Sequence, residues 1–162
     1  MSEMPKHESN DAVLQRLAWI EKRAELACRV ASEDVRDPEC RLALRALARR
    51  YAHLARDLRI LARHFCEVDA RPGAATPCRV ASPMMLDGLE ERSAAAALSF
   101  CLEREDAAID GYRYAEQRGW PELVAAALTR NRLIHASARR ELAARGARAV
   151  PEHVLLRAAG GE

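Results

Sequence analysis

The pattern of apolar positions along the chain predicts long amphipathic helices. It is clearest over residues 38–68, where apolar side chains recur at alternating spacings of four and three residues, which is typical of a helix that buries one face. This apolar seam comprises Cys40, Leu44, Leu47, Tyr51, Leu54, Leu58, Leu61, Phe65 and Val68. Ala48, Ala55 and Ala62 flank it at heptad spacing. Because these side chains are small, a neighbouring helix can approach closely.

Similar patterns predict three more helices, at residues 11–32, 93–118 and 121–145. The starts of the second and fourth helices carry matching sequences, Asp-Pro-Glu at 37–39 and Trp-Pro-Glu at 120–122. Proline fits the first position of a helix, and a glutamate in the first turn interacts favourably with the helix dipole. Each pair of helices should therefore form a hairpin with a short turn.

Two such hairpins predict an all-α, antiparallel four-helix bundle over residues 11–146. Residues 1–10 are expected to be disordered, and residues 147–162 to form a C-terminal tail. A long loop at 69–82 either turns back or crosses the bundle, and a short extra helix is predicted at 83–91, before the third long helix. At 162 residues the chain is long enough for one domain with a sizeable core.

Polar residues interrupt the apolar stripes at one height of the predicted bundle. Glu105 and His135 lie about fifteen residues on either side of the second turn, so an antiparallel hairpin brings them together. Glu21 and Tyr51 lie about the same distance from the first turn. Asn131 is one helical turn before His135. The sequence thus predicts a polar layer near mid-height.

Three interpretations of this layer are open. Glu105 and His135 can form a hydrogen-bonded or ionic pair that fixes the helix register, with Tyr51 and Asn131 completing it. Alternatively, Glu105 and His135 bind a metal with Glu21 or Glu25, or Glu105 faces solvent. A dinuclear carboxylate site needs Glu-x-x-His motifs on two helices. No such motif occurs here, so the metal hypothesis is a partial site of Glu21, Glu105 and His135 for iron or manganese, and no other cofactor is predicted.

Composition excludes several functional classes. The formal net charge is +2 and acidic and basic residues are interleaved along the chain, whereas nucleic-acid binding needs a concentrated basic surface. Five cysteines without a C-x-x-C pair fit reduced thiols better than a disulfide framework. No apolar run is long enough for a membrane span, and the first residues do not resemble a signal peptide. We therefore expect a cytoplasmic protein without nucleic-acid or membrane partners.

Several short motifs together resemble a bacterial family of ferritin-like four-helix bundles known only as a domain of unknown function. They are Ala-Ser-Glu-Asp-Val at 31–35, Asp-Pro-Glu at 37–39, His-Leu-Ala-Arg-Asp-Leu at 53–58, Glu-Arg-Glu-Asp at 103–106, Tyr112 and His135. The resemblance covers residues 12 to 145 and implies a ferritin-like bundle with an acidic/His centre. Its recurring polar positions correspond to Glu33, Asp57, Glu103, Glu105 and His135. Cys28, Val30 and Asp57 depart from the family pattern.

The functional expectation is a non-enzymatic, ferritin-like bundle that acts as an oligomeric stress-related or interaction protein. Neither a glycine-rich phosphate loop nor a G-x-S-x-G motif is present. We predict a homo-oligomer, with residues 83–91 as a further surface for a protein partner because they contain Met84, Met85, Leu86 and Leu89. The alternative is a metal-binding ferritin-like protein with a degenerate carboxylate/His site.

Overall fold

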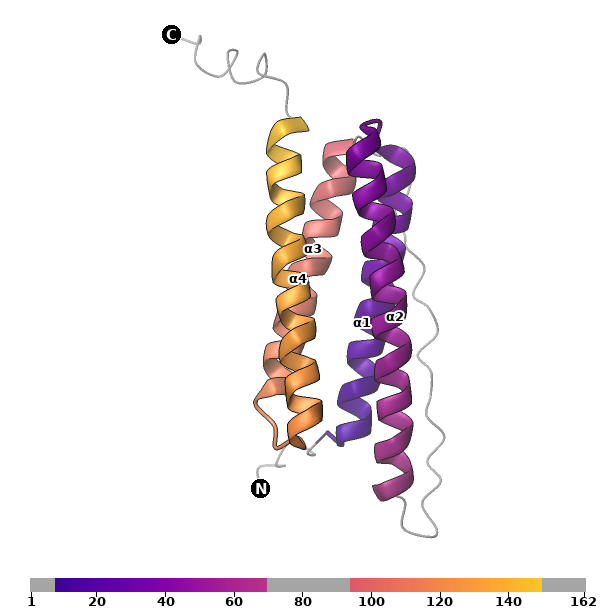
Figure 1. The fold of residues 1–162 in the computed structure, drawn as a ribbon, viewed down its shortest axis with the longest axis vertical. Coiled ribbons are helices and arrows are strands. Elements are labelled where there is room, and N and C mark those ends of the chain that lie inside the picture. Colours follow the sequence, from indigo (N-terminus) through magenta and orange to yellow (C-terminus); the bar gives the residue numbers. More distant parts are fainter. Residues whose placement is uncertain (1–7, 70–93, 150–162) are drawn as a thin grey trace, which may run out of the picture.

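A computed structural model describes residues 8–69 and 94–149, and within these ranges it contains four α-helices and no strand (Figure 1). They are α1 (Asn10–Asp34), α2 (Pro38–Asp69), α3 (Ala94–Glu116) and α4 (Glu122–Ala149). The all-α, four-helix prediction is confirmed. Helix α4 continues beyond the predicted end at residue 145 and includes Gly146.

Side chains near the helix ends define the two short turns. The Asp37 carboxylate accepts a hydrogen bond from the backbone N–H of Cys40 at 2.7 Å and so caps the start of α2. In the second turn, the Trp120 indole N–H donates to the carbonyl of Ala115 at 2.7 Å. The same indole packs edge-on against Phe65 of α2, with ring centroids 5.6 Å apart.

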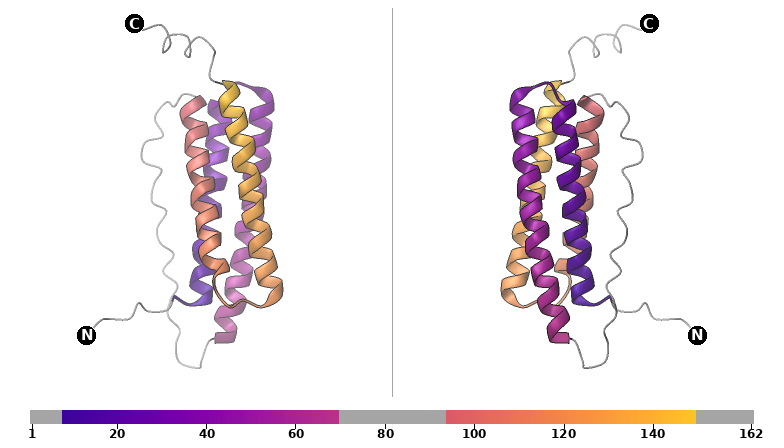
Figure 2. Two further views of the ribbon diagram at one scale, coloured as in Figure 1. Left: turned by 90° about the vertical axis from the view of Figure 1, so that its left-hand side faces the viewer. Right: turned by 90° about the vertical axis from the view of Figure 1, so that its right-hand side faces the viewer.

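The helices form two hairpins that lie side by side (Figures 1 and 2). Helix α1 packs closely along α2, α3 packs against α4, and the α1–α3 contact joins the hairpins, whereas α2 and α4 come close at only a few positions. Helices α2 and α3 run in the same direction (Figure 2). The end of α2 and the start of α3 therefore lie at opposite ends of the bundle. The predicted helix at 83–91, nearly all of the loop at 69–82 and most of the predicted tails are outside the described residues.

The apolar core consists of two clusters along the bundle. The first cluster contains Leu44, Leu98 and Leu142 with the C-terminal half of α1. The second contains Leu14, Leu58 and Leu128. Every seam residue from Cys40 to Leu58 is buried, while Leu61 and Phe65 are half-buried. This confirms the predicted inner face of α2 over these positions. No helix in the described part of the chain has the length and apolar character needed to cross a membrane.

Candidate functional site: a buried polar layer

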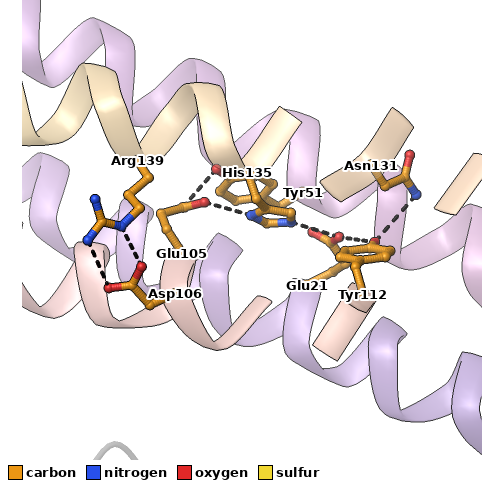
Figure 3. A network of polar contacts seen from close by, with 8 residues as sticks. All are labelled: Glu21, Tyr51, Glu105, Asp106, Tyr112, Asn131, His135 and Arg139. Atoms are coloured by element: carbon orange, nitrogen blue, oxygen red, sulfur yellow. Dashed lines mark hydrogen bonds and ion pairs between the residues drawn. The ribbon is translucent and has the colours of Figure 1, made fainter. Parts of the chain in front are cut away.

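Between the two apolar clusters, all four helices contribute to one connected group of polar side chains (Figure 3). We call this group the polar layer. It consists of Glu21 from α1, Tyr51 from α2, Glu105 and Tyr112 from α3, and Asn131 and His135 from α4. Glu21, Glu105 and His135 are 0% exposed. Ionisable groups buried this completely must be paired to be tolerated in the core.

The imidazole of His135 lies at the centre of the layer, between two carboxylates (Figure 3). Its Nδ1 is 2.6 Å from Oε2 of Glu105, and its Nε2 is 2.9 Å from Oε1 of Glu21. With a proton on each nitrogen, the ring donates a charge-assisted hydrogen bond on both edges.

Two tyrosines donate further hydrogen bonds to the carboxylates. The Tyr51 hydroxyl donates to Oε1 of Glu105 at 2.8 Å, and the Tyr112 hydroxyl donates to Oε1 of Glu21. The Tyr51 ring also stacks on the imidazole of His135, with centroids 4.7 Å apart and ring planes 13° apart. Asn131 donates from Nδ2 to the Tyr112 hydroxyl at 3.4 Å. The layer is thus one continuous network across the bundle.

The surroundings of His135 favour its charged form. Burial alone lowers the pKa of an imidazole, but the hydrogen bonds and the negative charges of Glu105 and Glu21 outweigh it and raise the pKa of His135 to about 9. Burial, followed by the nearby carboxylates, raises the pKa of Tyr51 and Tyr112 well above the usual phenol value. Both tyrosines therefore stay protonated and act as donors.

The two carboxylates differ in how completely they are bonded. Both oxygens of Glu105 have a partner, Tyr51 on one and His135 on the other. Oε1 of Glu21 takes part in two contacts, while its Oε2 is buried without a hydrogen-bond partner. Oδ1 of Asn131 is also buried without a partner. Unsatisfied acceptors in a low-dielectric core are unfavourable.

Most of the predicted mid-height residues meet as expected. Glu105 and His135 form the predicted pair, and Glu21, Tyr51 and Asn131 join it, so the interpretation with Glu105 in solvent is wrong. Glu25 lies outside the layer.

Glu25 instead contacts the ammonium of Lys22 at 2.6 Å and the guanidinium of Arg29 at 3.8 Å. Glu33, Asp57 and Glu103, which the family resemblance singled out, are exposed.

Tyr112 is the member that the sequence reasoning missed. It lies seven residues after Glu105 and is expected from the sequence only as part of the family resemblance, not as a member of the polar layer. Seven residues are about two helical turns, so both side chains lie on one face. A tyrosine on a stripe that already carries a buried carboxylate was the available signal, because a buried phenol needs a hydrogen-bond partner.

The three predicted metal ligands come together, but on opposite sides of a ring. Glu21 lies at the Nε2 edge of His135 and Glu105 at the Nδ1 edge (Figure 3). Within residues 8–69 and 94–149, no group of three or more His, Cys, Asp or Glu residues is placed to hold one metal ion. A metal centre formed by Glu21, Glu105 and His135 stays a prediction.

No family model matches the sequence, and no curated protein matches it. The similarity to the ferritin-like family of unknown function also stays a prediction.

Proposed function

We propose that this protein is a non-enzymatic, ferritin-like helical bundle that acts as an oligomeric interaction protein. The observation that carries the proposal is the enclosure of its polar layer. Glu21, Glu105 and His135 are 0% exposed and contact one another. No part of these three side chains is exposed for a substrate to bind. We therefore assign them a structural role, which is to hold the helices together.

The directions of the helices support a ferritin-like arrangement. Because α2 and α3 run the same way (Figure 2), one long connection must join opposite ends of the bundle. Ferritin-like folds have one such crossover between two hairpins. Short turns join the helices within each hairpin, at residues 35–37 and 117–121.

The polar layer also explains how the hairpins are held in register. The bonds from Tyr51 to Glu105, from Tyr112 to Glu21, and between His135 and Glu21 all join the first hairpin to the second. Sliding one hairpin by a helical turn would break these bonds and place charged groups against apolar side chains. Such a layer specifies one alignment of the helices.

Large apolar side chains on the outer faces of α2 and α4 support self-association. Leu42 and Ile60 of α2 are 65% and 58% exposed, and Leu123 and Leu133 of α4 are 86% and 56% exposed. Covering such apolar surface with a second copy of the chain lowers the free energy, because it removes the surface from water.

Sedimentation of the full chain at micromolar concentration tests the proposal. We expect a dimer or larger species. Leu42→Glu with Ile60→Glu, and separately Leu123→Glu with Leu133→Glu, should show which helix face forms the contact, since a buried charge at the interface dissociates the copies. The pairs serve as matched controls for each other. A wild-type protein that sediments only as a monomer would contradict the oligomeric function.

A further inference from the structure

We infer that the outer face of α2 is a docking surface for an acidic, amphipathic helix of a protein partner. The inference rests on the proposed function, which makes the chain an interaction protein, and it names the chemistry of the partner. The surface is a second stripe of residues on α2, which we call the outer stripe. It consists of Leu42, Ala46, Arg49, His53, Arg56, Ile60 and Arg63.

The outer stripe has the spacing of a helix-packing seam. Its residues recur at alternating steps of four and three, and each lies two positions after a residue of the buried apolar seam. Two residues turn a helix by about 200°, so the stripe and the seam run along opposite sides of α2. Every residue of the outer stripe is exposed. The helix therefore presents a second surface, about 30 Å long, on which another helix can pack.

The charge on this face is almost entirely positive. Residues 40–65 contain seven arginines and one acidic residue, Asp57, which lies 3.8 Å from the guanidinium of Arg56. Within the described ranges, five exposed arginines of α2 have no carboxylate partner, namely Arg45, Arg49, Arg50, Arg59 and Arg63.

The other three helices differ in this respect. Six of their arginines form ion pairs with carboxylates, namely Arg16, Arg29, Arg113, Arg132, Arg139 and Arg145. Charges that are interleaved along the chain are thus sorted by the fold, and cations without counter-charges gather on α2. Such a surface attracts an acidic partner.

The apolar members of the stripe decide between anionic partners. Leu42 and Ile60 are 65% and 58% exposed, and a nucleic-acid phosphate backbone has no apolar group to cover them. They lie about 27 Å apart along α2 with arginines between them, whereas a helix that lies on a membrane needs a continuous apolar face. A helix with apolar residues near its ends and glutamates between them fits both features, because guanidinium groups bond carboxylates with two parallel hydrogen bonds.

A second copy of α2 does not fit this stripe. In a symmetric pair of outer stripes, Arg49 and Arg56 would face arginines of the other copy, and like charges facing each other across an interface are unfavourable. The inference therefore assigns self-association to α4, where Leu123 and Leu133 are exposed. The two outer faces then serve different contacts.

The test measures binding of two synthetic peptides to the full chain by fluorescence anisotropy. Both are helical peptides of four heptads with leucine at the two ends of the seam, and the central seam positions carry glutamate in one and lysine in the other. We expect the glutamate peptide to bind at micromolar concentration and the lysine peptide not to bind. Equal binding of the two peptides, or no binding of the glutamate peptide at near-millimolar concentration, would overturn the inference.

Charge-reversal variants locate the contact. Arg49→Glu with Arg56→Glu should weaken binding of the glutamate peptide by about a hundredfold and allow the lysine peptide to bind. Arg130→Glu with Arg140→Glu makes the same change in charge at exposed positions of α4 and should bind like the wild type. An equal loss in both double variants would show a general effect of net charge and overturn the assignment to α2.

Duplex DNA and phosphatidylglycerol vesicles test the other anionic partners. Tighter binding of either one than of the glutamate peptide, lost in the Arg49/Arg56 variant, would overturn the choice of a protein helix. Sedimentation of the same samples separates this inference from the proposed oligomer. A monomer that binds the glutamate peptide through α2 removes the oligomer and keeps the docking surface, whereas an oligomer that does not bind it removes the docking surface alone.

Discussion

The polar layer and the apolar clusters on either side of it are buried alike but depend on different physics. In the clusters, Leu14, Leu44, Leu58 and Leu142 are at most 1% exposed and contribute through the area they remove from water. In the layer, Glu21, Glu105 and His135 are equally buried, and each contributes only while its partners are present. The clusters should respond to substitutions in proportion to the volume removed, whereas the layer should respond as a unit.

The largest effect should follow from removing one charged member of the layer. We expect His135→Ala to lower the free energy of unfolding by about 3–5 kcal/mol, because it leaves Glu21 and Glu105 buried without a cation. Glu105→Ala keeps the His135–Glu21 pair and should cost about 1–3 kcal/mol, because the Tyr51 hydroxyl and Nδ1 of His135 lose their acceptor. Urea denaturation of the single variants measures this. Single variants as stable as the wild type would show that the layer is not tightly coupled.

The control for these variants removes all three charges together. His135 contacts both carboxylates. A variant that replaces only Glu105 and His135 therefore leaves the charge of Glu21 buried without a cationic partner. Glu21→Leu, Glu105→Leu and His135→Leu combined should therefore be more stable than either single variant and than the Glu105→Leu/His135→Leu double variant. If the double variant equals the triple, Glu21 is not coupled to the pair.

A truncation in the apolar seam should have a slightly smaller effect. Leu58 is 1% exposed and Leu54 is 7% exposed, so Leu58→Ala should cost about 2–5 kcal/mol and Leu54→Ala should lie toward the lower end of that range. The same urea experiment applies. Losses below about half a kilocalorie per mole at both positions would conflict with the buried-face assignment of α2.

Stability should depend on pH through the layer and not through the clusters. His135 has a pKa of about 9 in the folded protein and about 6.5 as a free side chain. Its stabilising contribution is therefore complete below pH 6.5 and is lost as the pH rises through about 9. Thermal melts of metal-free protein at pH 6 and pH 9.5 should show a larger decrease for the wild type than for the triple leucine variant. An equal decrease in both would assign the pH dependence to other groups.

The smallest effect is expected at Gly111, in the interior of α3. A methyl group there would lie 2.8 Å from Cδ1 of Ile20, the flexible end of a half-buried side chain that can move aside. Alanine also favours a helix over glycine by up to about 1 kcal/mol. Gly111→Ala should thus raise the melting temperature slightly. A marked decrease would mean that Ile20 cannot adjust and that the α1–α3 contact is rigid there.

The sequence predicts the helices well because each carries a local pattern. The four-three repeat from Cys40 to Leu58 depends only on helix geometry, and the cap at Asp37 depends on residues three positions apart. Mid-height placement of Glu105 and His135 follows from counting residues from a turn. The relative direction of α2 and α3 could not be predicted in this way, because the sequence of residues 70–93 is compatible with either a turn or a crossover.

The details of the polar layer depend on contacts between distant segments. Tyr112 and Glu21 are 91 positions apart, and no local pattern indicates that the hydroxyl meets that carboxylate. The sequence also treats Glu21 and Glu105 as equivalent, because both interrupt an apolar stripe. Only the orientation of the imidazole distinguishes them, and that orientation is a property of the packed bundle.

The three bonds between the hairpins have a consequence for folding kinetics. Each hairpin can form from neighbouring segments, but the bonds of Glu21 and Tyr51 to the second hairpin form only after the hairpins dock. Interactions made late are absent from the folding transition state, so changing them leaves the folding rate nearly constant and accelerates unfolding. We therefore expect the polar layer to control mainly how long the assembled bundle persists.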